Sequence, residues 1–298
     1  MASSREPLAW VLNLDAEDEL AHPGAHTPTA AMKERIEGLR PQLASLVLPG
    51  DRVIWPGAEP IELGLLGRAW CPTRWALSQL ERARVRQPRA PHMDVLRRVN
   101  HRRFNHELGQ FLPGAGFAED PGAFRGLLST GAQASVERCW LLKRPFGYAG
   151  RGRRKWRAGE LIAADHSWLE ASWRDGEGLQ VEPWVERVFD CALHGFLEED
   201  GECTFGRVTL QDVDATGAWR STVLAPGGTL TSTEEESLVH EARRTAEALH
   251  AAGYFGPFGL DGYRWVAPDG SVHFQPRSEI NARYSMGWAI GMVVHSRG

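Results

Sequence analysis

The chain has 298 residues, of which 42% are hydrophobic and 24% charged, and its formal net charge is −4. This length allows one large domain or two medium ones, with the composition of an ordinary globular protein. No apolar run approaches the ~18 residues that cross a bilayer, and the N-terminus lacks the layout of a signal peptide, so a cytoplasmic protein is expected. The acidic balance argues against a nucleic-acid binder.

Basic residues nevertheless concentrate in two segments. Residues 82–103 carry eight arginines and a single acid, and residues 151–157 carry four arginines and a lysine. Such segments in an acidic protein indicate local anion sites, such as sites for phosphates; a solvated basic face is the alternative. The four cysteines are far apart and the histidines form no zinc-type grouping, so free thiols and no zinc site are expected.

The first third of the chain predicts a small α/β unit. An apolar run at residues 9–14 reads as a buried strand, residues 30–46 have helical spacing, and residues 51–56 read as a second strand. This order favours an α/β unit over residues 1–93, closed by a proline-containing linker at 86–93. A helix over 94–109, capped by Asp94 and ended by Gly109, is then expected to open a second unit over 94–298.

The second unit predicts mostly strands. Residues 137–145 read as a strand that runs into a glycine-rich turn at 146–152, and residues 178–186 read as a strand interrupted by a proline. Residues 189–197 are expected to pair with 202–210, and 234–252 to form a long amphipathic helix. Residues 259–266 and 272–279 then predict a hairpin about Pro268 to Gly270.

A lysine stands directly before the glycine-rich turn. Lys143 ends its strand, and the turn that follows contains Gly147, Gly150 and Gly152. Glycines allow backbone N–H groups to approach phosphate oxygens, and the lysine adds a positive charge. A Walker A loop and a protein kinase are disfavoured, because in both the lysine follows the glycines. A structural turn without a ligand is the alternative.

A proline interrupts the strand at 178–186. Pro183 stands between Glu182 and Trp184, and a strand broken in this way has unpaired backbone groups. An adenine ring needs one such donor and acceptor, together with apolar walls. An edge strand with a proline bulge is the alternative.

The end of the chain carries acid, amide and guanidinium groups at alternate positions. In a strand, Glu279, Asn281 and Arg283 would share one face while Ile280 and Ala282 face the core. Paired with Asp261 in the hairpin, the two oxygen ligands can converge on Mg²⁺, and an arginine can reach a phosphate that the metal bridges. A polar edge strand with a surface ion pair is the alternative.

Taken in order, these segments resemble the ATP-grasp superfamily of carboxylate ligases over about residues 95–298. The resemblance is carried by Lys143–Gly147, Val181–Val185 and Glu279–Arg283. It implies a mixed α/β and α+β fold: a small N-terminal α/β domain precedes an ATP-grasp module that binds ATP between two α+β subdomains. The lid subdomain would span about residues 130–186.

The resemblance also implies a role for each matching residue. Lys143 would contact the phosphates under the loop of Gly147, Gly150, Arg151 and Gly152. Glu182 and Val185 would offer main-chain groups to adenine beside Trp184, and Asp190 would bind the ribose. Asp261, Glu279 and Asn281 would hold Mg²⁺, or Mn²⁺ in its place, and Arg283 would face the transferred phosphate.

Two departures from the family pattern stand out. An upstream lysine of the family is replaced by an arginine, which is Arg102 or Arg103. Arginine keeps the charge and allows bidentate phosphate contact. Pro276 removes a hydrogen-bond donor from the last strand, so that strand is expected to lie at an edge or to carry a bulge.

The predicted activity is an ATP- and Mg²⁺-dependent ligase that activates a carboxylate as an acyl phosphate and joins it to an amine. The sequence contains no convincing nucleophile arrangement, so catalysis would depend on positioning and charge neutralisation. A ligase with another acceptor, a phosphotransferase and a non-catalytic nucleotide-binding regulator remain alternatives. Small-molecule substrates are expected, without nucleic acid or membrane partners, and a homodimer is compatible with the sequence.

Overall fold

The N-terminal region forms a three-stranded parallel sheet. The structure is a computed structural model that describes residues 6–24, 26–61, 64–109, 112–132, 135–147, 152–157, 163–174, 176–213 and 219–292. The strands lie in the order β2-β1-β3. With their helices, the elements are β1 (Leu8–Val11), α1 (Ala16–Ala21), α2 (Ala30–Leu39), β2 (Arg52–Val53), β3 (Leu66–Ala69) and α3 (Arg74–Arg82).

The predicted strand–helix–strand unit is therefore present, although its elements are shorter than expected. The helix predicted to reach residue 46 ends at Leu39, and turns follow it. The strand β3 and the helix α3 were not predicted, and β3 completes the sheet beside β1. Parallel strands place their carboxyl ends at one edge, so the segments that follow β1 and β2 lie close together.

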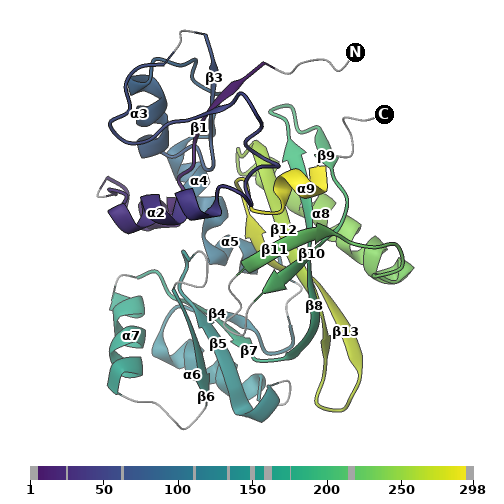
Figure 1. Cartoon of the computed structure of the whole chain (residues 1–298). Helices are drawn as coiled ribbons and strands as arrows, with labels where there is room; N and C mark the ends of the chain where they lie inside the picture. The colour runs from purple at the N-terminus through teal and green to yellow at the C-terminus, as the bar shows by residue number, and fades with distance from the viewer. Residues whose placement is uncertain are drawn as a thin grey trace.

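A second sheet has four antiparallel strands in the order β4-β7-β5-β6. Figure 1 shows it at the lower left, beside the helices α6 and α7. The predicted strands at 137–145 and 178–186 are β5 and β7. The elements are β4 (Gly116–Ala118), α6 (Pro121–Thr130), the 3₁₀ turn at Val136–Arg138, β5 (Cys139–Lys143), β6 (Arg153–Arg157), α7 (Ala163–Arg174) and β7 (Leu179–Pro183).

The largest sheet follows the order β11-β10-β8-β12-β13, with β9 paired to β8. The long helix α8 contacts β8 and β13, and the predicted hairpin is β12 with β13. The elements are β8 (Glu186–Leu197), β9 (Cys203–Phe205), β10 (Thr209–Val213), β11 (Trp219–Leu224), α8 (Ser232–Ala251), β12 (Gly256–Val266), β13 (Val272–Asn281) and α9 (Trp288–Met292).

The single helix predicted over 94–109 was wrong. Two helices occupy the segment, α4 (Met93–Asn100) and α5 (Arg102–Glu107), and they meet at His101. The backbone of His101 is extended, and its ring accepts a hydrogen bond from the Arg103 N–H, which caps α5. The cap of α4 is His92 rather than Asp94, because the His92 ring accepts from the Asp94 N–H.

Pro276 lies where the sequence predicted. The strand β13 is the last in its sheet, and its register against β12 shifts between Asp261 and Tyr263. Gly262 sits at this irregularity, where a Cβ would lie 2.8 Å from the carbonyl oxygen of Gln275. A side chain at that position would push the two strands apart, so the shift requires glycine.

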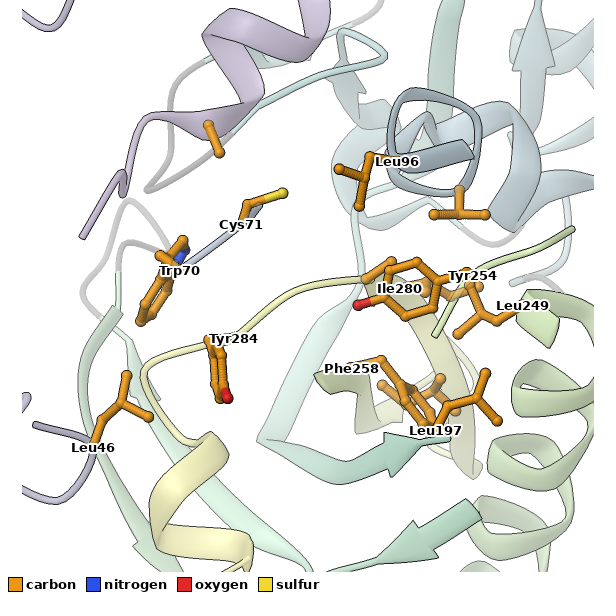
Figure 2. Packing of buried hydrophobic residues seen from close by; sticks show 14 of the residues in the cluster. Leu46, Trp70, Cys71, Leu96, Leu197, Leu249, Tyr254, Phe258, Ile280 and Tyr284 are labelled. Carbon is orange, nitrogen blue, oxygen red and sulfur yellow. The ribbon is translucent and has the colours of Figure 1, made fainter. Parts of the chain in front are cut away.

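One core joins the N-terminal region to the large sheet. Figure 2 shows Trp70 and Leu96 from the first part of the chain in the same buried cluster as Phe258 and Ile280. Burial of each such side chain contributes about 1.5–3 kcal/mol to the free energy of folding. The cluster therefore stabilises the packing of the N-terminal region against the large sheet. No helix among the described residues is long and apolar enough to span a membrane.

Candidate nucleotide and metal site

A cavity of about 270 Å³ lies where the three sheets approach one another. The predicted site residues come to it from α5, from strands of both later sheets and from the loops beside them, and side chains that precede α3 close its far end. The predicted residues that line it are Arg102, Lys143, Gly147, Asp190, Asp261, Glu279, Asn281 and Arg283.

The acidic side of the cavity is built by the register of β12 and β13, which places Asp261 opposite Glu279. Asn281 donates to Asp261 at 3.0 Å, and Gln211 donates to its other oxygen at 2.8 Å. Gln211, on β10, was not predicted. The strand alternation is as expected, because Ile280 is buried in the core.

The two carboxylates have opposite pKa shifts. Burial, reinforced by the nearby charge of Glu279, raises the pKa of Asp261 to about 6. Burial also opposes the ionisation of Glu279, but Arg102 and Lys143 outweigh it and lower the pKa of Glu279 to about 2. Glu279 therefore stays ionised at neutral pH, whereas Asp261 needs a further cation to stay fully ionised below neutral pH.

These groups suit a hard divalent cation. Two carboxylates and one amide offer oxygen ligands on adjacent strands, and Mg²⁺ typically takes one or two protein carboxylates together with substrate phosphates. Among the residues that the structure describes, no group of three or more His, Cys, Asp or Glu could hold a metal by itself. A cation here would thus depend on phosphate oxygens for part of its coordination.

The buried lysine has its own counter-ion. The Lys143 ammonium lies 2.9 Å from Glu182, which also accepts from Gln180. All three side chains are buried, and the β5–β7 register places them on adjacent strands. The side chain of Glu182 therefore holds Lys143 at the cavity, a role that sequence reasoning missed.

Of the two arginines left open by the sequence, Arg102 lines the cavity. Its guanidinium lies 2.9 Å from Glu279 and donates to the Arg144 carbonyl at 3.0 Å. Arg103 points elsewhere, to Glu119 at 2.5 Å. The break between α4 and α5 sets this direction, because the Arg102 N–H bonds the Pro145 carbonyl at 3.2 Å.

Arg283 lies just beyond β13, and its N–H bonds the Asn281 carbonyl at 2.9 Å. Its guanidinium donates to Glu17, at 2.6 Å through Nε. Glu17 belongs to α1 and is buried; burial raises its pKa although the Arg283 charge opposes the shift. The acids that follow β1 were visible in the sequence, but nothing linked them to residue 283.

Most of the predicted adenine-binding residues do not line this cavity. Trp184 uses both main-chain groups within the fold: its N–H donates to Cys139 and its carbonyl accepts from Val136, each at 2.9 Å. Its ring faces the Lys155 ammonium at 3.8 Å. Val185 is buried against Tyr263, so an adenine role for this segment stays a prediction.

The glycine-rich turn is described only in part. Gly147 lines the cavity, and Gly152 has a positive φ of 70° and accepts from the Arg144 N–H at 2.7 Å. Gly150 and Arg151 lie outside the described residues. Asp190 accepts from Arg187 at 2.6 Å, and the Arg187 guanidinium lies 4.0 Å from the centre of the Tyr263 ring.

Several other arginines of the two basic segments are in ion pairs. Arg97, Arg154 and Arg157 each lie 2.5 Å from a carboxylate oxygen, and Arg89 pairs with Glu199. These arginines therefore balance acids of the fold, and among the described residues of the two segments Arg102 and Arg153 line the cavity.

Comparisons with known proteins agree with this arrangement at the level of the fold. No family model and no curated protein matches the chain. The structure is similar to D-alanyl-alanine synthetase A from Vibrio cholerae, with a TM-score of 0.56 and 11% identity, covering 98% of this chain and 94% of that one. It is also similar to biotin carboxylase from Campylobacter jejuni, with a TM-score of 0.55 and 11% identity, covering 96% and 71%.

The chain has the ATP-grasp fold. A third similar structure is N5-carboxyaminoimidazole ribonucleotide synthetase from Thermus thermophilus, with a TM-score of 0.50, 17% identity and coverage of 93% and 72%. At these identities the likeness concerns the fold of the chain alone. The four cysteines are free thiols, as predicted.

The far end of the first cavity is mainly apolar. Leu14, Met32, Leu39 and Trp70 line it from the N-terminal unit, and the exposed Arg35 stands at its border. Trp219 and Met286 complete it from the large sheet. The cavity is thus charged on one side and mainly apolar on the other.

Proposed function

We propose that the chain is an ATP-dependent carboxylate–amine ligase whose nucleotide and metal bind at the charged side of the cavity. The observation that carries this is the convergence of Lys143, Asp261 and Glu279, from three strands, on one cavity of an ATP-grasp fold. Two similar structures hold nucleotides, a β,γ-ATP complex of biotin carboxylase and a Mg-ADP complex of a carboxylase domain.

In this proposal each charged group has one task. Lys143 and Arg102 neutralise phosphate charge, and Asp261, Glu279 and Asn281 supply oxygen ligands. The metal, when bound, would neutralise the charge that develops on the β- and γ-phosphates. Arg283 would face the transferred phosphoryl group, where a guanidinium can form two hydrogen bonds to phosphate oxygens.

The reaction then follows from positioning. A substrate carboxylate oxygen attacks the γ-phosphorus, the bond to the β-phosphate oxygen breaks, and ADP leaves. The amine nitrogen attacks the carbonyl carbon of the acyl phosphate, loses a proton and expels inorganic phosphate, which leaves an amide. The apolar side chains at the far end of the cavity, such as Trp70 and Leu14, suit an acyl substrate with an apolar body.

The test is ADP release from the full chain with Mg²⁺ and ATP against a panel of amino acids and small peptides. We expect substrate-dependent release of ADP. In Glu279→Gln the rate of ADP release should fall at least about 10²-fold, because the metal that neutralises phosphate charge in the transition state would lose a carboxylate ligand. Glu202→Gln, on an exposed loop of the same sheet, is the matched control and should keep wild-type turnover. ATP binding without substrate-dependent ADP would favour a regulatory nucleotide-binding protein, and unchanged turnover in Glu279→Gln would remove the metal assignment.

A further inference from the structure

A second cavity, of about 170 Å³, lies wholly within the N-terminal unit. None of its lining residues borders the first cavity. The segment after β1 and the helix α2 form the wall between the two: Leu14 and Met32 line the first cavity, whereas Asn13 and Lys33 line the second.

This cavity lies at the carboxyl ends of the parallel strands. Val11 ends β1, and Ile54 and Trp55 follow β2; all three line the cavity. In open parallel sheets, ligands bind in the crevice outside the carboxyl ends of the strands. The N-terminal unit therefore has a cavity at the edge where such sheets usually bind ligands.

A carboxylate with spare hydrogen-bonding capacity lines the cavity. Asp15 is only 3% exposed, and its Oδ1 is buried without a hydrogen-bond partner among the described residues. Its Oδ2 lies 3.5 Å from Nε2 of His26. Asp15 occupies the N-cap position of α1, yet its side chain makes no capping hydrogen bond. The carboxylate is therefore not used by the helix behind it.

The remaining polar groups of the cavity do not satisfy this carboxylate. Asn13 donates to the Cys71 carbonyl at 2.8 Å and to Thr73 at 3.2 Å, so its amide is committed to the fold. Lys33 is exposed and lies over the Trp55 ring, 5.6 Å from its centre. Burial raises the pKa of Asp15, although the nearby His26 and a backbone hydrogen bond oppose the shift, so the carboxylate is only partly compensated.

Aromatic rings supply the other walls. Trp55 and Trp75 both line the cavity and are half-buried. The Trp75 ring meets the His26 ring edge to face, with centroids 5.9 Å apart. Indole faces attract cations, and the position of Lys33 over Trp55 is an example within this cavity.

We propose that this second cavity binds a small organic ammonium ion, with its N–H groups on Asp15 and its apolar body between Trp55 and Trp75. The proposal is independent of the ligase assignment, because it uses no residue of the first cavity. A metal ion fits less well, because no group of three His, Cys, Asp or Glu suited to a metal occurs among the described residues. An anion would be repelled by the buried Asp15 carboxylate, and the Lys33 ammonium that lines the cavity is exposed and lies over the Trp55 ring.

Benzylamine is a suitable probe for the experiment, and benzyl alcohol is its uncharged counterpart of similar shape. Binding to the full chain is followed by calorimetry at pH 8, where benzylamine is mainly protonated. We expect saturable binding of benzylamine and at least tenfold weaker binding of benzyl alcohol. This comparison uses the wild-type chain, so it does not depend on any variant folding.

Variants then locate the site. Asp15→Asn should weaken benzylamine binding at least tenfold, whereas Glu34→Gln, an exposed acid on α2, should leave it unchanged. Binding should also persist in Lys143→Ala and with saturating Mg²⁺-ATP, because the nucleotide groups line the other cavity. Thermal unfolding of Asp15→Asn reports whether a loss of binding reflects a loss of the fold.

Four results would overturn the proposal. They are no saturable binding of benzylamine, equal affinity for benzyl alcohol, wild-type affinity in a folded Asp15→Asn, and displacement by Mg²⁺-ATP. The last would move the site to the first cavity. None of them bears on ADP release, so the two proposals fail separately.

Discussion

Arg277 and Arg283 belong to the same stretch of chain, at the end of β13, and each is buried against a glutamate. Their surroundings nevertheless differ. Arg277 is fully buried and donates to Glu241 at 2.6 Å, to the side chain of Asn105 at 2.5 Å, and to the carbonyls of Asn105 and Gly109. Arg283 donates to Glu17 and to the Tyr284 carbonyl, and it lines the cavity.

The two ion pairs differ in how many of their polar atoms lack a partner. Glu241 has a second cationic partner, Arg244, at 2.6 Å, and Arg277 lines neither the first nor the second cavity. Glu17 keeps one buried oxygen without a partner among the described residues. A saturated buried ion pair serves the fold, whereas one with unused capacity beside a cavity is suited to a ligand.

The largest effect on stability is expected from Arg277→Met. Removing this guanidinium takes one cation from the buried Glu241 and leaves the Asn105 and Gly109 acceptors without their donor, so the free energy of unfolding should fall by about 3–5 kcal/mol. Urea unfolding measures it. Arg157→Met removes an exposed pair with Glu137 and should cost about 0–1 kcal/mol. Equal losses in both variants would contradict the structural role of Arg277.

Arg283→Met should lower turnover as well as stability, because it also leaves the buried Glu17 without its cation. If Arg283 faces the transferred phosphoryl group, ADP formation should fall by about 10²–10³-fold, while the Kd for Mg²⁺-ATP stays within about threefold, as expected for a contact made in the transition state. Steady-state kinetics and calorimetry on the same preparation separate the two quantities. A loss of nucleotide affinity with unchanged kcat would place Arg283 in ground-state binding.

The carboxylates of the proposed metal site predict that the affinity for Mg²⁺-ATP depends on pH. The pKa of Asp261 is raised to about 6, so its carboxylate is ionised above pH 6 and gains a proton as the pH falls through that value. Metal binding needs the ionised form, so the Mg²⁺-ATP affinity should be constant from pH 7 to 8 and fall by about tenfold per unit below pH 6. Asp261→Asn should abolish this slope. A wild-type affinity that is independent of pH down to 5 would contradict the assignment.

The smallest effect is expected at the N-terminal cap of α8. Thr231 caps α8 through a capping box with Glu234, and Thr231→Ala should lower the free energy of unfolding by about 1 kcal/mol. ATP affinity should not change. A larger effect on ATP affinity than on stability would mean that α8 contributes to the site.

The strands and their polar faces could be predicted from the sequence because their signals are local. Alternation at Glu279 and Asn281, the proline of β7 and the turn of the hairpin each lie within a few residues. The break at His101 was missed, since the apolar spacing of α4 gives no sign of the contact between Arg102 and Pro145, which fixes it from outside the helix.

Long-range partners could not be predicted in the same way. Glu17 and Arg283 lie 266 positions apart in the sequence, and Gln211 lies 50 positions from Asp261, to which it donates a hydrogen bond. One sequence carries no signal for such pairs, because either residue alone reads as an ordinary surface charge or amide. The side-chain role of Glu182 was missed for the same reason, because its partner Lys143 lies 39 positions away on the neighbouring strand.

The most direct test of the central claim is calorimetric titration of Mg²⁺-ATP into the wild-type chain and Lys143→Ala. We predict one saturable site in the wild type that requires Mg²⁺, and at least about tenfold weaker binding in the variant, since a hydrogen bond to a charged group contributes about 1.5–3 kcal/mol. Lys33→Ala, an exposed lysine outside the first cavity, should bind as the wild type does. Wild-type affinity in a folded Lys143→Ala, or no Mg²⁺-dependent binding at all, would contradict the claim that this cavity is a metal–nucleotide site.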